Sequence, residues 1–173
     1  MLLEERDSIG WVLKALREAG NSILVEFHGL DEQMLGRRPN DDEWCLKEIA
    51  AHMRDAEELS LLQMMTILED ARQSLPVWDV DALPSERDYR AADLGDLLSE
   101  LHRLRRETTQ LLWSIANRDW RVKAQHRYRG EISLEDIARE LAQHDLEHLW
   151  QVRRLKHQLG AKVHVSGDDD VWR

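Results

Sequence analysis

The stretch SLEDIARELAQHDLEHLWQVRRLKHQLG, residues 133–160, decides the fold because it carries the pattern of a long amphipathic helix. Ser133 is a suitable N-cap, and Asp136 three positions later completes a weak capping box. Gly160 is a natural residue to follow the last helical turn. Side chains at spacings of three and four form one stripe, which places them on one helix face: Ile137, Leu141, His144, His148, Val152, Leu155 and Leu159.

Three earlier segments show the same period and are also predicted to be helices. They cover approximately residues 3–27, 45–74 and 93–116. Gly20, inside the first of them, indicates a bend or a point of close packing. No segment reads as a β-strand, so the intervening stretches are predicted to be loops. The connector that includes Pro76 and Pro84 and reaches residue 92 is too long for a tight turn, so it either crosses over or covers an opening.

Four amphipathic helices without strands predict an all-α protein, a four-helix bundle in a single domain. Up-and-down connectivity is the simplest arrangement. The bundle is expected to occupy residues 1–160, and residues 161–173 are expected to form a C-terminal extension.

Composition excludes several classes of protein. The net charge of −10, from 34 acidic and 24 basic residues, argues against a nucleic-acid partner. The local cluster of Arg103, Arg105 and Arg106 is interpreted as a solvated helix face. Cys45 is the one cysteine, which excludes an internal disulfide. The N-terminus MLLEERDSIG does not read as a signal peptide, and no apolar run approaches the roughly 20 residues of a membrane span. A cytoplasmic protein without a membrane partner is expected.

Three histidines fall on the predicted core faces. His144 and His148 stand at i and i+4, and His52 lies on the stripe of the second helix. A buried polar group without a partner costs roughly 1–3 kcal/mol, and one divalent cation would satisfy all three rings. Hydrogen-bonded structural histidines are the alternative, and the residues alone leave the two interpretations about even. The other five histidines are expected at the surface: His28, His102, His126, His157 and His164.

Neutral imidazoles suit Zn, Ni, Fe or Cu, and three protein ligands leave coordination positions open, as in catalytic sites. The string HDLEH, residues 144–148, also has the form of an inverted zincin motif, in which Glu147 or Asp145 would be the general base. A protease is disfavoured because the chain is short for that class. A di-iron bundle is disfavoured because only Asp145-x-x-His148 approaches its ligand motif.

Two further strings carry a family resemblance. WCLKEIAAH, residues 44–52, resembles the W-[ST]-x-x-E-[IL]-x-x-H signature of the DinB-like/YfiT superfamily, and HDLEHLWQV, residues 144–152, resembles its H-x-x-x-H-x-x-Q signature. The resemblance covers nearly the whole chain, from the first helix to Gly160. It implies a four-helix bundle, often a homodimer, that holds a divalent metal ion (Zn, Ni or Fe) through His52, His144 and His148.

The resemblance also implies two kinds of activity. One is transfer of a low-molecular-weight thiol to a small-molecule substrate, and the other is hydrolysis, with a metal-bound thiol or water as the nucleophile. The alternative is a non-catalytic module for dimerisation or stress response, in which the metal ion stabilises the fold.

Several residues near the predicted ligands are candidates for supporting roles. Asp55, Asp145, Glu147 and Gln151 are candidates to orient an imidazole or to move a proton. Cys45 stands where the family has Ser or Thr, and because Cys is a poor N-cap, Asp42 or a shifted helix start is expected to replace it. Cys45 is not expected to bind the metal, although a reactive thiol at a helix N-terminus is a further hypothesis.

Overall fold

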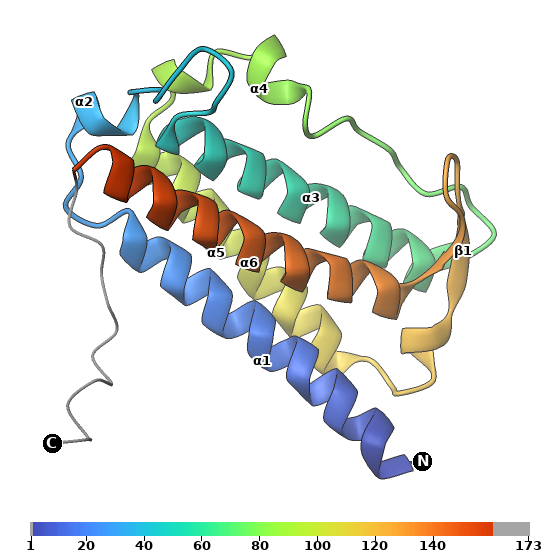
Figure 1. Ribbon diagram of the computed structural model, residues 1–173. Helices are drawn as coiled ribbons and strands as arrows, with labels where there is room; N and C mark the ends of the chain where they lie inside the picture. The colour runs from blue at the N-terminus through green and yellow to red at the C-terminus, as the bar shows by residue number, and fades with distance from the viewer. Residues whose placement is uncertain (1, 161–173) are drawn as a thin grey trace, which may run out of the picture.

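The computed structural model describes residues 2–160, which form a bundle of four long helices (Figure 1). The long helices are α1 (Leu2–Glu26), α3 (Leu46–Asp70), α5 (Leu94–Ser114) and α6 (Leu134–Gln158). The connections contain two short helices, α2 (Glu32–Leu35) and α4 (Leu83–Glu86), and two turns of 3-10 helix, η1 (Tyr89–Ala91) and η2 (Asp119–Arg121). The predicted four-helix bundle is confirmed, and the predicted extension at 161–173 lies outside the described residues.

The helices are arranged as a square in which α1 and α3 each pack against both α5 and α6. The chain in Figure 1 runs one way along α3 and α5 and the opposite way along α1 and α6. The simple expectation of up-and-down connectivity is therefore wrong. The connector after α3 carries the chain back along that helix, so that α5 begins near the end where α3 began (Figure 1). Its length makes this return geometrically feasible.

Two large clusters of apolar side chains fill most of the bundle. The first includes Leu16 on α1 and Leu112 on α5, and the second includes Ile23 on α1 and Leu101 on α5. Three buried charged residues on α3, α5 and α6 fall between the cluster positions along each helix: Glu57, Arg105 and Asp145. The core is thus divided by a polar layer, which is described with the site below.

The predicted start of the last helix is confirmed. Ser133 is the N-cap of α6, its hydroxyl accepts a hydrogen bond from the Asp136 backbone N–H, and the Asp136 carboxylate accepts one from the Ser133 N–H at 2.8 Å. This capping box satisfies two of the backbone donors that a helix start leaves free. Gly160 follows the helix with a φ of +77°, the left-handed region that glycine adopts without strain.

The prediction that the chain contains no β-strand is wrong. Residues Lys123–His126 (β1) and Gly130–Ser133 (β2) form an antiparallel hairpin in which Lys123 pairs with Ser133. Two strands of four residues are too short for period-two patterning to stand out from a loop. His126, expected at the surface, is buried in this hairpin. The second strand leads directly into α6 and so defines where that helix begins.

Within residues 2–160, no helix is both long and apolar enough to cross a membrane.

Candidate metal centre

Three histidines from two helices converge at the seam between α3 and α6. His52 comes from the second turn of α3 and is fully buried, whereas His144 and His148 come from the middle of α6 and are half-buried. The Nε2 atom of His144 lies 2.8 Å from that of His52 and 3.0 Å from that of His148. One ring nitrogen of each histidine therefore points at a common position, and all three nitrogens lie within 4.8 Å of one another.

The other ring nitrogens determine which tautomers are present. His52 Nδ1 lies 3.1 Å from the Val80 carbonyl oxygen, and His148 Nδ1 lies 2.7 Å from the Gln151 side-chain oxygen. Because a carbonyl oxygen only accepts, each Nδ1 carries the proton and each Nε2 presents a lone pair. Two acceptors thus face His144 Nε2, which has at most one proton to donate.

The three facing Nε2 atoms therefore carry too few protons to satisfy one another by hydrogen bonding. If His144 Nε2 is protonated, one of the two neighbouring lone pairs still lacks a donor. If His144 carries its proton on Nδ1 instead, that buried atom has no partner among the described residues, and three lone pairs meet at one point. A cation is the group that satisfies three converging imidazole lone pairs, so the residues fit a divalent metal ion.

Burial keeps the rings neutral. It lowers the pKa of His52 and of His148 below the usual value for histidine. The pKa of His144 falls to about 3, because burial and the two neighbouring imidazoles both oppose its protonation. Neutral imidazole is the form that binds metal, so the site is ready for an ion at neutral pH.

The connector between α3 and α5 supplies one wall of the site. Apart from the Val80 contact with His52, it is attached to α3 where Gln63 donates to the Pro76 carbonyl oxygen at 2.8 Å and where the Tyr89 hydroxyl donates to the Asp55 carboxylate. Of the two alternatives predicted for this connector, the crossover is the one observed, since the segment runs back beside α3 (Figure 1).

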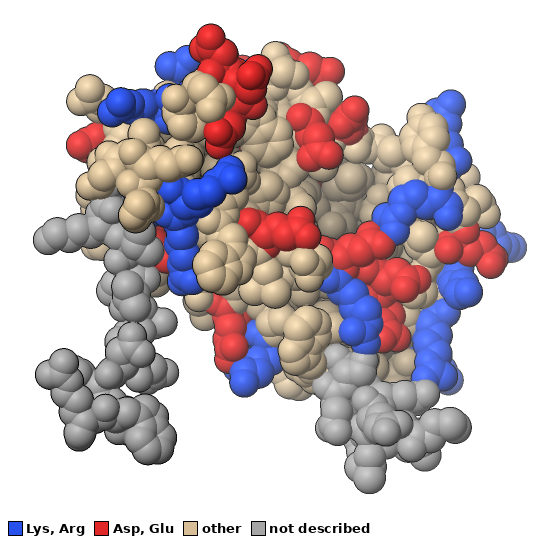
Figure 2. Space-filling model, viewed as in Figure 1, with Lys and Arg blue, Asp and Glu red and all other residues tan. Residues whose placement is uncertain are grey.

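Two further groups lie beside the histidines: Asp81, which sequence reasoning missed, and Trp44, the first residue of the signature at 44–52. Asp81, on the connector, places Oδ1 3.8 Å from His52 Nε2 while its side chain is 82% exposed. The Trp44 ring centroid lies 4.8 Å from that of His52. Figure 2 shows a hollow between α6 and the connector with acidic side chains on both sides. Nothing in the sequence around Asp81 marks it, because only the fold of the connector brings it to the site.

The four residues predicted to support the ligands have different surroundings. Gln151 bonds to His148, as described above. Asp55 instead accepts from Tyr89 and pairs with Arg54, and Glu147 is exposed and accepts from Gln143. Asp145 is buried and faces away from the histidines, toward Arg105.

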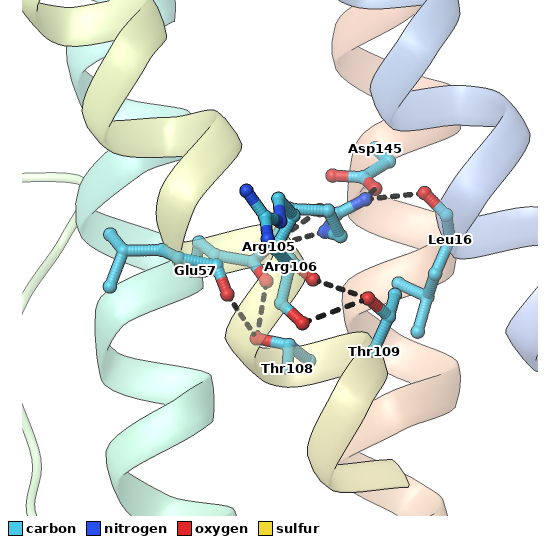
Figure 3. Close-up of polar contacts among 8 residues, drawn as sticks. Leu16, Glu57, Arg105, Arg106, Thr108, Thr109 and Asp145 are labelled. Carbon is cyan, nitrogen blue, oxygen red and sulfur yellow. Dashed lines mark hydrogen bonds and ion pairs between the residues drawn. The ribbon is translucent and has the colours of Figure 1, made fainter. Parts of the chain in front are cut away.

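Arg105 is the centre of a buried polar layer that holds the four helices together (Figure 3). Its guanidinium donates to Glu57 on α3, to Asp145 on α6 at 2.6 Å, and to the Leu16 carbonyl oxygen on α1 at 2.6 Å. The interpretation of Arg105 as part of a solvated face was therefore wrong. Because Asp145 adjoins His144, this layer also holds the middle of α6, and with it the two histidines, against α3.

The charges in this layer shift the pKa values of Arg105 and Asp145. The two carboxylates raise the pKa of Arg105, which stays positively charged. Burial, together with the nearby Glu57, raises the pKa of Asp145 to about 6 despite the attraction of Arg105. Two buried carboxylates share a single cation, so the layer depends on that cation.

Cys45 is structural. It is the N-cap of α3 itself, so neither Asp42 nor a shifted start replaces it. Its backbone N–H donates to the Glu48 carboxylate at 2.8 Å, and Arg38 pairs with the same carboxylate. Burial raises the pKa of the thiol, which contradicts the hypothesis of a reactive cysteine.

Comparisons with known proteins bear on the family and the fold. A model of the DinB superfamily matches residues 15–152. The solved structure of YfiT from Bacillus subtilis, described as a probable metal-dependent hydrolase with an unusual four-helix bundle topology, aligns with a TM-score of 0.81 and 18% identity over 89% of this chain and 89% of that one. At this identity the likeness shows the fold alone. No curated protein matches the chain.

Proposed function

The chain belongs to the DinB superfamily, and we propose that it is a metal-dependent hydrolase whose divalent ion is held by His52, His144 and His148. The observation that carries the proposal is the convergence of three Nε2 atoms with too few protons to satisfy one another. The description of the similarly folded YfiT as a probable metal-dependent hydrolase supports the reaction type.

Three protein ligands suit a catalytic site better than a structural one, because structural sites usually close four positions with protein groups. A divalent ion bound here would supply Lewis acidity to a substrate oxygen and lower the pKa of coordinated water. Zn, Ni and Fe are the candidate ions because all three accept neutral imidazole.

The protein groups around the site have separable roles in this proposal. Val80 and Gln151 hold the rings of His52 and His148 in the tautomer that presents Nε2. Asp81, exposed at the mouth, accepts the proton of an attacking water. The Trp44 ring limits the access of solvent to His52 from the start of α3.

Metal analysis of the purified protein tests the binding step. We expect one ion per chain after reconstitution of chelator-treated protein with Zn, Ni or Fe, measured by mass spectrometry. His144→Ala should abolish stoichiometric binding, whereas His157→Ala, an exposed histidine on the same helix, should leave it unchanged. Full binding by His144→Ala, or none by the wild type, would contradict the proposal.

An activity screen tests the reaction. Reconstituted protein is offered esters, amides and phosphoesters, and separately a small thiol with an electrophile. Asp81→Asn should lower kcat for hydrolysis by about 10²-fold or more while metal content is retained, and Asp79→Asn on the same connector serves as the control. Transfer of the thiol without hydrolysis would replace the proposed reaction. A strong loss of thermal stability on metal removal, with no activity in any assay, would favour the non-catalytic module.

A further inference from the structure

A second cavity lies on the opposite side of the bundle from the histidines. It has a volume of about 260 Å³ and opens at the seam between α1 and α5, whereas the candidate metal centre lies at the seam between α3 and α6. The volume is slightly below the range of about 300–1,000 Å³ typical of small-molecule sites. The cavity therefore has room for a short ligand.

The floor of this cavity is apolar. Ile23 on α1, Met53 on α3 and Leu101 on α5 line it and are themselves almost fully buried, and Leu24 adds a half-buried wall. Gly20 also lines it, and a Cβ atom at that position would lie 3.0 Å from Arg105 Nη1. The missing side chain thus allows close approach to Arg105, which is the packing role predicted for this glycine.

The charge of the cavity is opposite to that of the protein. Its titratable lining residues are Arg17, His102, Arg105 and Arg106, and none of its lining residues is acidic, although acidic residues outnumber basic ones by 34 to 24 in the chain. Arg105 is already occupied by Glu57 and Asp145. Arg17 and Arg106 are exposed and have no carboxylate partner within the part of the chain whose side chains are described.

We propose that the cavity between α1 and α5 binds a small amphipathic carboxylate, such as a medium-chain fatty acid. Its apolar tail lies over Leu24 and Leu101, and its carboxylate pairs with Arg17 and Arg106 at the mouth. Guanidinium groups recognise carboxylates with paired, charge-assisted hydrogen bonds, which explains why the site selects an anion. This site does not depend on the proposed metal chemistry, because it shares no residue with the three-histidine centre.

Calorimetric titration of the full-length protein with octanoate tests the proposal. We expect one site per chain with a dissociation constant on the order of 0.1–1 mM. Protonated octylamine, which has the same tail and the opposite charge, should not bind there. Absence of saturable binding at about ten times that octanoate concentration, or equal binding of the amine, would overturn the proposal.

Charge-reversal variants assign the binding to this cavity. Arg17→Glu and Arg106→Glu should each weaken octanoate binding at least about tenfold, whereas Lys14→Glu, which makes the same charge change one turn earlier on α1, should leave it unchanged. Arg106→Gln, a milder change, covers the case of a misfolded charge reversal and should also weaken binding. Equal affinity in all four variants would overturn the assignment.

Methyl NMR spectra show where the ligand lies. Octanoate should shift the Leu24 and Leu101 methyl signals and leave the His148 ring signals unchanged, in the presence of a chelator as in its absence. Binding that disappears with the chelator, or that shifts only the histidine signals, would place the carboxylate at the metal centre and overturn the inference.

Discussion

His144 and Asp145 are neighbours in the chain, yet their side chains serve two different centres. The Nε2 atom of His144 lies 2.8 Å from that of His52 at the α3–α6 seam. The Asp145 carboxylate oxygen Oδ2 lies 2.6 Å from Arg105 Nη1 in the polar layer of the core. One turn of α6 therefore connects the candidate metal centre to the layer that joins all four helices. A change in the layer should be felt at the histidines.

Arg105→Met should be the most damaging single substitution in the core. It leaves the Glu57 and Asp145 carboxylates buried without their cation, which typically costs about 3–5 kcal/mol. Urea denaturation of the metal-free protein measures the loss. Arg103→Met, an exposed position on the same helix, should change the free energy of unfolding by less than about 0.5 kcal/mol. Similar stability of the two variants would show that the layer contributes little.

Periodicity in the sequence predicted the four long helices and brought His144 and His148 together on one core face, because core faces repeat every three or four residues. His52 needed the paired family signatures, since no local pattern shows that two helices pack face to face. The role of Arg105 could not be predicted, because a buried arginine has the same local pattern as a solvated one. Its carboxylate partners lie 48 and 40 residues away, as the bonds to Glu57 and Asp145 show.

The connector illustrates the same limit. Its length was visible in the sequence, but neither the direction of α5 nor the position of Asp81 was. Both follow from tertiary contacts, such as those of Val80 and Tyr89 with α3, that leave no periodic trace. The hairpin was missed for a different reason, since each of its strands has only four residues, too few for an alternating pattern to stand out.

Gln151→Ala should weaken metal binding without unfolding the protein. Gln151 accepts the Nδ1–H of His148, and the loss of such an orienting partner typically lowers metal affinity by about 10–100-fold. Competition with a chromophoric chelator measures the affinity. Gln143→Ala removes a glutamine on the same helix that bonds only to the exposed Glu147, so its affinity should equal that of the wild type. Equal affinity in both variants would show that the His148 ring needs no such support.

Tyr89→Phe should loosen the connector that walls the site. The hydroxyl donates to Asp55, whose carboxylate is 2% exposed, and its loss should cost about 1–3 kcal/mol. Because Arg87 and Arg90 flank Tyr89 and are exposed, trypsin should cut the variant there faster than the wild type. Tyr128→Phe, at an exposed tyrosine in the hairpin turn, is the control. Unchanged cleavage of Tyr89→Phe would mean that other contacts hold the connector.

Acidification should destabilise the metal-free protein. The pKa of His144 is about 3 in the folded state against about 6.5 unfolded, and those of His52 and His148 are also lowered. The unfolded chain therefore binds more protons between about pH 3 and 6.5, so stability falls as pH falls through that window. His144 alone accounts for about 2 kcal/mol between pH 7 and 5.

Asp145 acts in the opposite direction. Its pKa is about 6 in the folded state, so the folded protein binds the extra proton between about pH 4 and 6. This proton uptake offsets about 1 kcal/mol of the stability that the histidines lose on acidification. The destabilisation from the lowered pKa values of three histidines outweighs the stabilisation from the raised pKa of one carboxyl group. Urea denaturation at pH 7, 6 and 5 should therefore show a falling free energy of unfolding, and His144→Gln should flatten the slope while His157→Gln should not. A stability that rises on acidification would mean that Asp145 dominates and that the histidine rings are less desolvated than their burial indicates.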